Sequence, residues 1–247
     1  MKPWIVTPER FLRPEDASRL LAVVRDRADL GRLRGRRAPV VEEIVVRLGL
    51  EAGLRLGEMA ALDVGDLPPR GSDRLTIRRG KGGRPGLVPL GEEPRKRLRE
   101  FLSWKRERGE ALGADAPLLL TPRKGRFTVR GLEKIVARAY AAAGIEGHRA
   151  HDLRHTYATI ALRATRDVVT VRDLLRHRDV RTTQVYAQVL SEDLGAAAEA
   201  VSRALSSSSP GKTNSVARDD ELERRVGRGN TNSQRRGAQP PRDEARR

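Results

Sequence analysis

Apolar residues recur at intervals of three and four along most of this chain, and that spacing restricts it to a fold built mainly from helices. In the clearest segment, Val40, Ile44 and Leu48 lie on one helical face with Val41 and Val45 beside them. Side chains spaced in this way form a stripe that packs against a core. Further helices are expected within residues 12–24, 98–105, 132–140, 153–161 and 191–205.

One segment breaks the helical spacing. Leu75 and Ile77 flank a polar residue before a glycine-rich run, and Leu87 and Val88 follow that run. This pattern predicts a β-hairpin with a flexible tip that carries Lys81. The expected fold class is therefore mainly α with a small antiparallel β-hairpin, that is, α+β.

Proline and glycine predict where the first helices begin and end. Pro14 opens the helix expected at 12–24, and the arginine-rich residues 32–37 then form a basic loop. Gly53 ends the following helix, so Arg55 lies just past its end.

Two more helices are predicted from Thr128 onward. Thr128 caps the first, and Gly144 stops it. The second is expected to bury a stripe formed by Leu153, Tyr157, Ile160 and Ala161. His151 and Arg154 are then left on the opposite face of that helix.

The charge indicates a polyanionic partner. The 247 residues carry a net charge of +17, which attracts phosphate backbones at long range. Residues 206–247 hold few large apolar side chains, so a disordered basic tail is expected there. Residues 1–37 are expected to form an N-terminal helix and basic loop, and residues 38–205 the main domain.

The chain contains no cysteine, no apolar signal core and no run of about 18 apolar residues. Disulfides, thiolate zinc sites and cysteine nucleophiles are thereby excluded. We expect a cytoplasmic protein, associated with DNA in the nucleoid and without membrane contact.

A group of polar residues with chemical potential lies within 151–186. His151 and Arg154 are three residues apart, so a helix presents an imidazole and a guanidinium on one face. A second imidazole, His177, follows, and Tyr186 lies nine residues beyond it. Arginine gives two hydrogen bonds to two phosphate oxygens and stabilises the charge that builds on them. The group is suited to cleaving a phosphodiester with a tyrosine nucleophile.

These residues resemble the tyrosine recombinase family, which includes the Xer proteins and the phage integrases. Residues 53–58, Gly-Leu-Arg-Leu-Gly-Glu, resemble the first arginine box of that family, and residues 75–90 resemble its lysine-bearing hairpin. The similarity covers about residues 38–205, in the order of the family. It implies that 38–205 is the catalytic domain of a recombinase.

The resemblance implies a clamp and a nucleophile. Arg55 and Arg154 would hold the scissile phosphate, and Tyr186 would attack the phosphorus to form a 3′-phosphotyrosyl link. The bond energy is conserved in that link, so strands are rejoined without ATP, metal or another cofactor.

The other implied residues handle protons and charge. Lys81 would protonate the leaving 5′-oxygen, His151 would accept the tyrosine proton or bind a phosphate oxygen, and His177 would donate a further hydrogen bond to the phosphate. Glu58 has a supporting role in orienting the arginines, with an ordinary helical surface charge as the equal alternative.

Two of these residues have other interpretations. Tyr186 is also compatible with a core tyrosine, because Val185 and Val189 are apolar neighbours. His148, His151 and His155 form an alternative metal site, but no H-E-x-x-H glutamate accompanies them.

The implied function is that of a site-specific recombinase or integrase which cuts and rejoins double-stranded DNA. It would act as a homo-oligomer assembled on DNA, with accessory recombination proteins as further candidate partners. A type IB topoisomerase shares the chemistry, but the Xer-like boxes favour a recombinase. A noncatalytic DNA-binding regulator is the alternative from another class, and it needs no tyrosine nucleophile.

Three features depart from the family pattern. Fewer than forty residues precede the first core helix, where the family usually has a separate helical domain. A minimal catalytic form, a fragment of a longer recombinase and a decayed gene product are the alternatives. Ala150 stands where proline is common, and Arg176 stands where glycine commonly precedes the histidine. Arg176 either alters the approach of His177 to phosphate or adds a phosphate contact.

Overall fold

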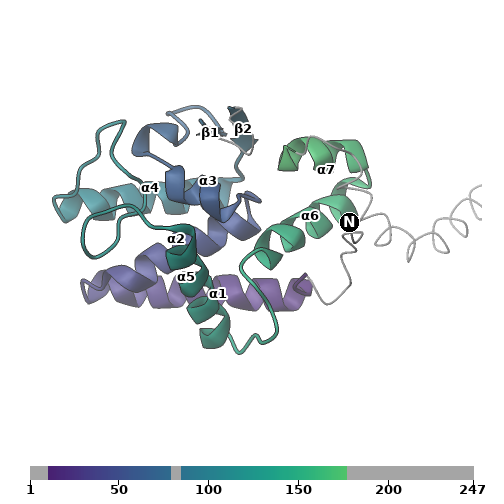
Figure 1. Cartoon of the computed structure of the whole chain (residues 1–247), viewed down its shortest axis with the longest axis horizontal. Helices are drawn as coiled ribbons and strands as arrows, with labels where there is room; N and C mark the ends of the chain where they lie inside the picture. Colours follow the sequence, from purple (N-terminus) through teal and green to yellow (C-terminus); the bar gives the residue numbers. More distant parts are fainter. Residues whose placement is uncertain (1–10, 79–84, 177–247) are drawn as a thin grey trace, which may run out of the picture. The chain divides into compact units, whose positions relative to one another are not determined.

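The computed structural model describes residues 11–78 and 85–176 (Figure 1). Within these ranges the chain is mostly helical, with one two-stranded antiparallel sheet. The elements are α1 (Pro14–Leu33), α2 (Arg37–Leu50), α3 (Leu56–Ala61), the short 3-10 helix η2 (Val64–Asp66), β1 (Arg74–Ile77), β2 (Gly86–Pro89), α4 (Glu92–Glu107), α5 (Val129–Ala142), α6 (Asp152–Thr165) and α7 (Val168–Leu175). The expected fold class is confirmed. None of the described helices combines the length and the apolar character needed to span a membrane.

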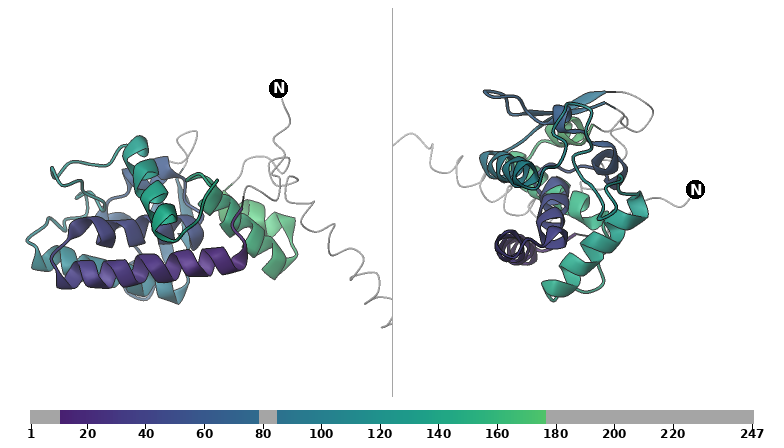
Figure 2. Two further views of the ribbon diagram at one scale, coloured as in Figure 1. Left: turned by 90° about the horizontal axis from the view of Figure 1, so that it is seen from below. Right: turned by 90° about the vertical axis from the view of Figure 1, so that its left-hand side faces the viewer.

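Helix α2 lies at the centre of the core. It contacts α1, α3, α4, α5 and α6, and it is buried from Val40 to Leu50. Figure 2 shows α1 running beside it. A helix covered on several sides needs apolar residues around most of its circumference, which explains its abundance of valine, isoleucine and leucine. Its buried Glu43 is paired, accepting hydrogen bonds from Arg47 at 3.0 Å and from Arg32 at 2.9 Å.

Helix α1 begins where predicted but continues to Leu33, past the expected end at residue 24. Ala28 and Gly31 extend its buried face, and a Cβ on Gly31 would lie 3.1 Å from the backbone of the turn before α2. Small residues thus let the two helices approach closely without adding to an apolar stripe. The basic loop expected at 32–37 is wrong, because only residues 34–36 separate the helices.

The β-hairpin matches its prediction. Leu75 pairs with Val88 and Ile77 with Gly86. Leu75, Ile77 and Val88 are buried, so one face of the hairpin covers the core, and β1 lies beside η2. The tip with Lys81 lies outside the described residues.

Both predicted ends of α5 are confirmed. The Thr128 side chain accepts a hydrogen bond from the backbone N–H of Gly131 at 3.1 Å, and Gly144 adopts a φ of +63° just past the helix. These signals are local, so the sequence alone located them.

Helix α6 packs on two sides, against α2 and against α7. Leu153 joins the main core, whereas Ala158 and Leu162 form a second cluster with residues of α7. The predicted burial of Ile160 is wrong, since 42% of that residue is exposed. Arg154, expected on the face opposite the predicted stripe, is also buried, with only 3% exposed. A helix that packs on two partners buries more than a single stripe.

Helices α1 and α2 share one hydrophobic core, so we expect them to unfold together in one cooperative transition. Leu20 is fully buried in that core, so Leu20→Ala should lower the free energy of unfolding by about 2–4 kcal/mol. Urea unfolding should be followed by circular dichroism and by tryptophan fluorescence. Leu33→Ala is the control, because Leu33 is 86% exposed, and it should change stability by less than about 0.5 kcal/mol. A separate early transition for α1 would contradict the shared core.

The predicted domain boundary at residue 38 stays a prediction.

Candidate active site

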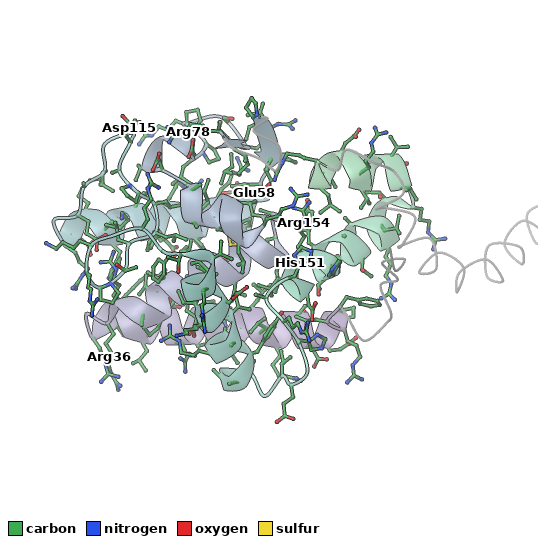
Figure 3. The ribbon with its side chains drawn as sticks, in the orientation of Figure 1. Arg36, Glu58, Arg78, Asp115, His151 and Arg154 are labelled. Atoms are coloured by element: carbon green, nitrogen blue, oxygen red, sulfur yellow. The ribbon has the colours of Figure 1, made fainter. Side chains whose placement is uncertain are left out.

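The predicted arginines lie where α3, α6 and α7 come together. Arg55 is the residue before α3, and Glu58 lies in the first turn of that helix. His151 precedes α6, and Arg154 lies in its first turn. Figure 3 shows Glu58, Arg154 and His151 in one region. Arg176, at the end of α7, joins them through Glu58.

Arg154 is held by backbone carbonyls from two other segments. Its Nη1 donates to the carbonyl oxygen of Gly53, in the turn after α2, and its Nη2 donates to that of Leu175 at 2.6 Å. A buried guanidinium is costly unless its N–H groups have acceptors. These carbonyls therefore fix Arg154 between the end of α2 and the end of α7.

Glu58 carries a buried carboxylate shared by two arginines. Its Oε1 accepts from Arg55 Nη1 at 2.9 Å. Its Oε2 accepts from the Arg55 backbone N–H at 2.9 Å and from Arg176 Nη2 at 2.7 Å. Burial opposes ionisation of this carboxyl, but the charges of Arg176 and Arg55 and the hydrogen bonds outweigh it and lower the Glu58 pKa. Glu58 is thus a carboxylate in the arginine cluster rather than a surface charge.

The surroundings of His151 favour its neutral form. Packing around the ring lowers its pKa, and the charges of Arg154 and Arg55 lower it further, while Asp152 opposes them. The residue still presents part of its surface to solvent. The ring of His155 packs edge-on against it with centroids 4.6 Å apart. A neutral imidazole can accept a proton at physiological pH.

An open groove brings two of these side chains to one surface. It has a volume of about 570 Å³, and its lining includes Arg55, Gly57, Val129, Arg149 and His151. A cation and a proton acceptor thus face the same accessible space. This arrangement is suited to an anionic ligand whose reaction involves a proton.

Residues 10–193 match the sequence profile of the phage integrase family. The chain belongs to this family. Its matched part is a Xer-like tyrosine recombinase catalytic domain. It is 33% identical to the tyrosine recombinase XerC of Chromohalobacter salexigens over 184 residues, covering 74% of this chain and 58% of the relative. It is 37% identical to XerC of Chromobacterium violaceum over 147 residues, covering 59% and 47%. The chain thus spans about half the length of these relatives.

Solved recombinases share the fold. The XerA recombinase superposes with a TM-score of 0.60 at 23% identity, covering 78% of this chain and 63% of that one. The XerH recombinase, in a post-cleavage complex with a palindromic difH substrate, gives a TM-score of 0.61 at 22% identity, covering 76% and 52%.

The structure describes only some of the site residues that were predicted from the sequence. Arg55, Glu58, His151 and Arg154 come together, as described above. The predicted residues Lys81, His177 and Tyr186 lie outside the described residues, as does the expected final helix at 191–205. Their roles stay predictions.

The alternative metal site gains no support from the described part of the chain. His148 lies in the loop before α6, and its Nδ1 is 3.3 Å from Oδ2 of Asp152, an ordinary pairing distance. Within residues 11–78 and 85–176, no group of three or more histidine, aspartate or glutamate side chains has the geometry to hold a metal ion.

Two contributors to the site were missed from the sequence. Gly53 was interpreted as a helix end and as the first residue of the arginine box, but the hydrogen bond from Arg154 to its carbonyl was not predicted. Arg176 was predicted either to alter the approach of His177 to phosphate or to add a phosphate contact, but its contact with Glu58 was not predicted. The signal for Arg176 was its occurrence at a position where glycine is common.

The pKa of His151 generates one prediction. Its NMR titration midpoint should lie below 6.5, and Arg55→Gln should raise it, because that change removes a nearby positive charge. The chain has four histidines, so each signal can be assigned by single replacement. Arg123→Gln, at an exposed position in another turn, should leave the midpoint unchanged.

The lowered pKa of His151 also determines how the stability of the folded protein changes with pH. Because the His151 pKa is lower in the folded state than in the unfolded state, its contribution to stability is complete above about pH 6.5 and is lost as pH falls through the folded value. A midpoint at or above 6.5 would contradict the electrostatic assignment.

Gly53 generates a second prediction. Its φ is +60°, and a Cβ there would lie 2.5 Å from Cδ1 of Tyr157. Gly53→Ala should therefore cost at least about 2 kcal/mol of stability, from backbone strain and the clash together. Gly144→Ala is the matched control, since Gly144 has a φ of +63° with open space around it. It should cost only about 1 kcal/mol in urea unfolding. Equal losses would show that the close contact with Tyr157 has no energetic consequence.

Proposed function

We propose that this protein is a site-specific recombinase that cuts and rejoins double-stranded DNA through a covalent bond to Tyr186. The observation that carries the proposal is the geometry of Arg55, bound to Glu58, and Arg154, bound to two backbone carbonyls, both close enough to His151 to lower its pKa. Membership of the phage integrase family supports the same chemistry. The proposed partner is DNA of the nucleoid, bound by protomers that assemble as a homo-oligomer, with accessory recombination proteins as further candidates.

The arginines lower the barrier to attack on phosphorus. A phosphodiester repels nucleophiles because its nonbridging oxygens are negative, and its pentacoordinate transition state carries more charge on them. Cations fixed in advance stabilise that charge without reorganising during the reaction. Arg154 is fixed by two carbonyls and Arg55 by Glu58, so both meet this requirement.

The covalent step exchanges one phosphoester for another. The Tyr186 oxygen bonds to phosphorus as the bond to the 5′-oxygen breaks, which leaves a 3′-phosphotyrosyl link and a 5′-hydroxyl. An ordinary tyrosine has a pKa of about 10, so only about one in a thousand is ionised at pH 7. His151 accepts the phenol proton, and Lys81 delivers a proton to the 5′-oxygen. His177 donates a hydrogen bond to the phosphate.

Rejoining reverses these steps. A 5′-hydroxyl attacks the phosphotyrosyl link, gives its proton to Lys81 and releases Tyr186. No net phosphoester bond is lost, which is why the proposed reaction needs neither ATP nor a metal ion.

Covalent capture tests the proposal. The full chain should be mixed with pooled nicked duplexes made from its source DNA, denatured in SDS and isolated, and the attached DNA should be sequenced. We expect attachment at defined sites with the natural chain and none with Tyr186→Phe, since phenylalanine lacks the nucleophilic oxygen. DNA binding should survive that change.

Other outcomes point to the alternatives. Clear DNA binding without attachment would contradict the proposal and favour a noncatalytic regulator. Relaxation of supercoils without recombinant products would favour a type IB topoisomerase.

A further inference from the structure

Arg176 has a backbone conformation that favours glycine. It ends α7 with φ of 54° and ψ of 44°, in the left-handed region. The left-handed conformation costs a residue with a Cβ about 1 kcal/mol of free energy relative to glycine. Its Nη1 is also buried and makes no hydrogen bond to the described residues. Stability alone therefore does not explain an arginine at this position.

The Arg176 side chain lies where three elements meet. Its Nη2 donates to Glu58 of α3 at 2.7 Å. A Cβ on Gly86, the first residue of β2, would lie 2.7 Å from Arg176 Cδ, so the side chain lies close against the hairpin backbone. Only 16% of the side chain is exposed. Arg176 thus links α7, α3 and the hairpin.

The contact between Arg176 and Glu58 determines how many guanidinium donors of Arg55 remain available to a ligand. Oε1 of Glu58 accepts a hydrogen bond from one guanidinium N–H of Arg55, while Oε2 accepts one from Arg176. The other guanidinium donors of Arg55 make no hydrogen bond within the described part of the chain, and its side chain is 25% exposed. Without Arg176, the buried carboxylate would have Arg55 as its one close cation. A guanidinium pairs readily with both oxygens of a carboxylate, which would withdraw a further Arg55 donor.

We propose that Arg176 is a positioning residue that shares Glu58 with Arg55 and so keeps the Arg55 guanidinium available to a phosphate. This inference rests on the proposed role of Arg55 as a phosphate clamp. The neighbouring carbonyl of Leu175 holds Arg154, so the end of α7 organises both arginines of the clamp.

The probe is inorganic phosphate, bound by the full chain at constant ionic strength. Its apparent dissociation constant is obtained from the rise in melting temperature with phosphate concentration. Arg176→Gly relieves the backbone strain, removes the contact with Glu58 and should weaken phosphate binding by about tenfold. Arg176→Lys keeps the charge and should bind phosphate with intermediate strength.

Lys124→Gly is the matched control. Lys124 is exposed on a turn with φ of 61°, so its replacement removes the same charge and relieves the same conformation. Its phosphate binding should equal that of the natural chain. This comparison removes the contribution of nonspecific binding by a strongly basic surface.

A double variant separates positioning from a merely structural role of Arg176. Arg176→Gly combined with Glu58→Gln replaces the competing carboxylate by a neutral amide, so Arg55 should be released and phosphate binding should recover at least in part. A merely structural role for Arg176 predicts no such recovery.

Three results would overturn the proposal. They are equal phosphate binding by Arg176→Gly and Lys124→Gly, no recovery in the double variant, and no phosphate-dependent stabilisation of the natural chain. If Arg176→Gly fails to fold, the comparison of Arg176→Lys with Lys124→Gly decides instead. Since the measurement needs no cleavage, failure of the proposed recombinase activity is recognised separately by covalent capture.

Discussion

The buried guanidinium of Arg154 joins the hydrophobic core to the candidate active site. Removing such a group from water is costly, so its N–H groups need acceptors, and they find them in the carbonyls of Gly53 and Leu175. The central helix α2, the helix α6 and the end of α7 therefore all contribute to holding one side chain. The approach of α6 to α2 depends in turn on a small residue, because a Cβ on Gly49 would lie 2.8 Å from Leu153. Core packing thus sets the geometry of the site.

Charge balance sets the electrostatic character of the same region. The cations around Glu58 repel each other, and its carboxylate, which pairs with Arg55 and Arg176, offsets part of that repulsion. Arg154 is held by backbone carbonyls, which carry no net charge, so the cluster of Arg55, Glu58, Arg154 and Arg176 is positive. That positive charge favours the neutral form of His151 and an anionic ligand. One arrangement of charges is therefore suited both to an anionic ligand and to a proton acceptor.

Caps and turns in the sequence located several elements correctly, whereas the end of α1 and the contacts between distant segments were not predicted. The cap at Thr128 and the hairpin that joins Leu75 to Val88 depend on residues close in sequence, and both were predicted. The exposure of Ile160 was missed because α6 packs on two partners, which a single apolar stripe does not indicate. The pairing of Arg176 with Glu58 joins residues 118 positions apart, and no spacing rule predicts it. The family motifs located candidate residues, but only the fold supplies their partners.

The left-handed conformation of Arg176 has a further consequence for the chain that leaves α7. A glycine there has many backbone conformations available, and they must be lost on folding. An arginine has fewer, and its contact with Glu58 selects among them. A long-range ion pair thus holds Arg176 in this unfavourable conformation, and the backbone at residue 176 is more narrowly specified than it would be with glycine. His177, a predicted catalytic residue, comes next in the sequence. The backbone conformation is therefore narrowly specified at the residue directly before it. Strain beside a functional site is tolerated where surrounding contacts determine the geometry.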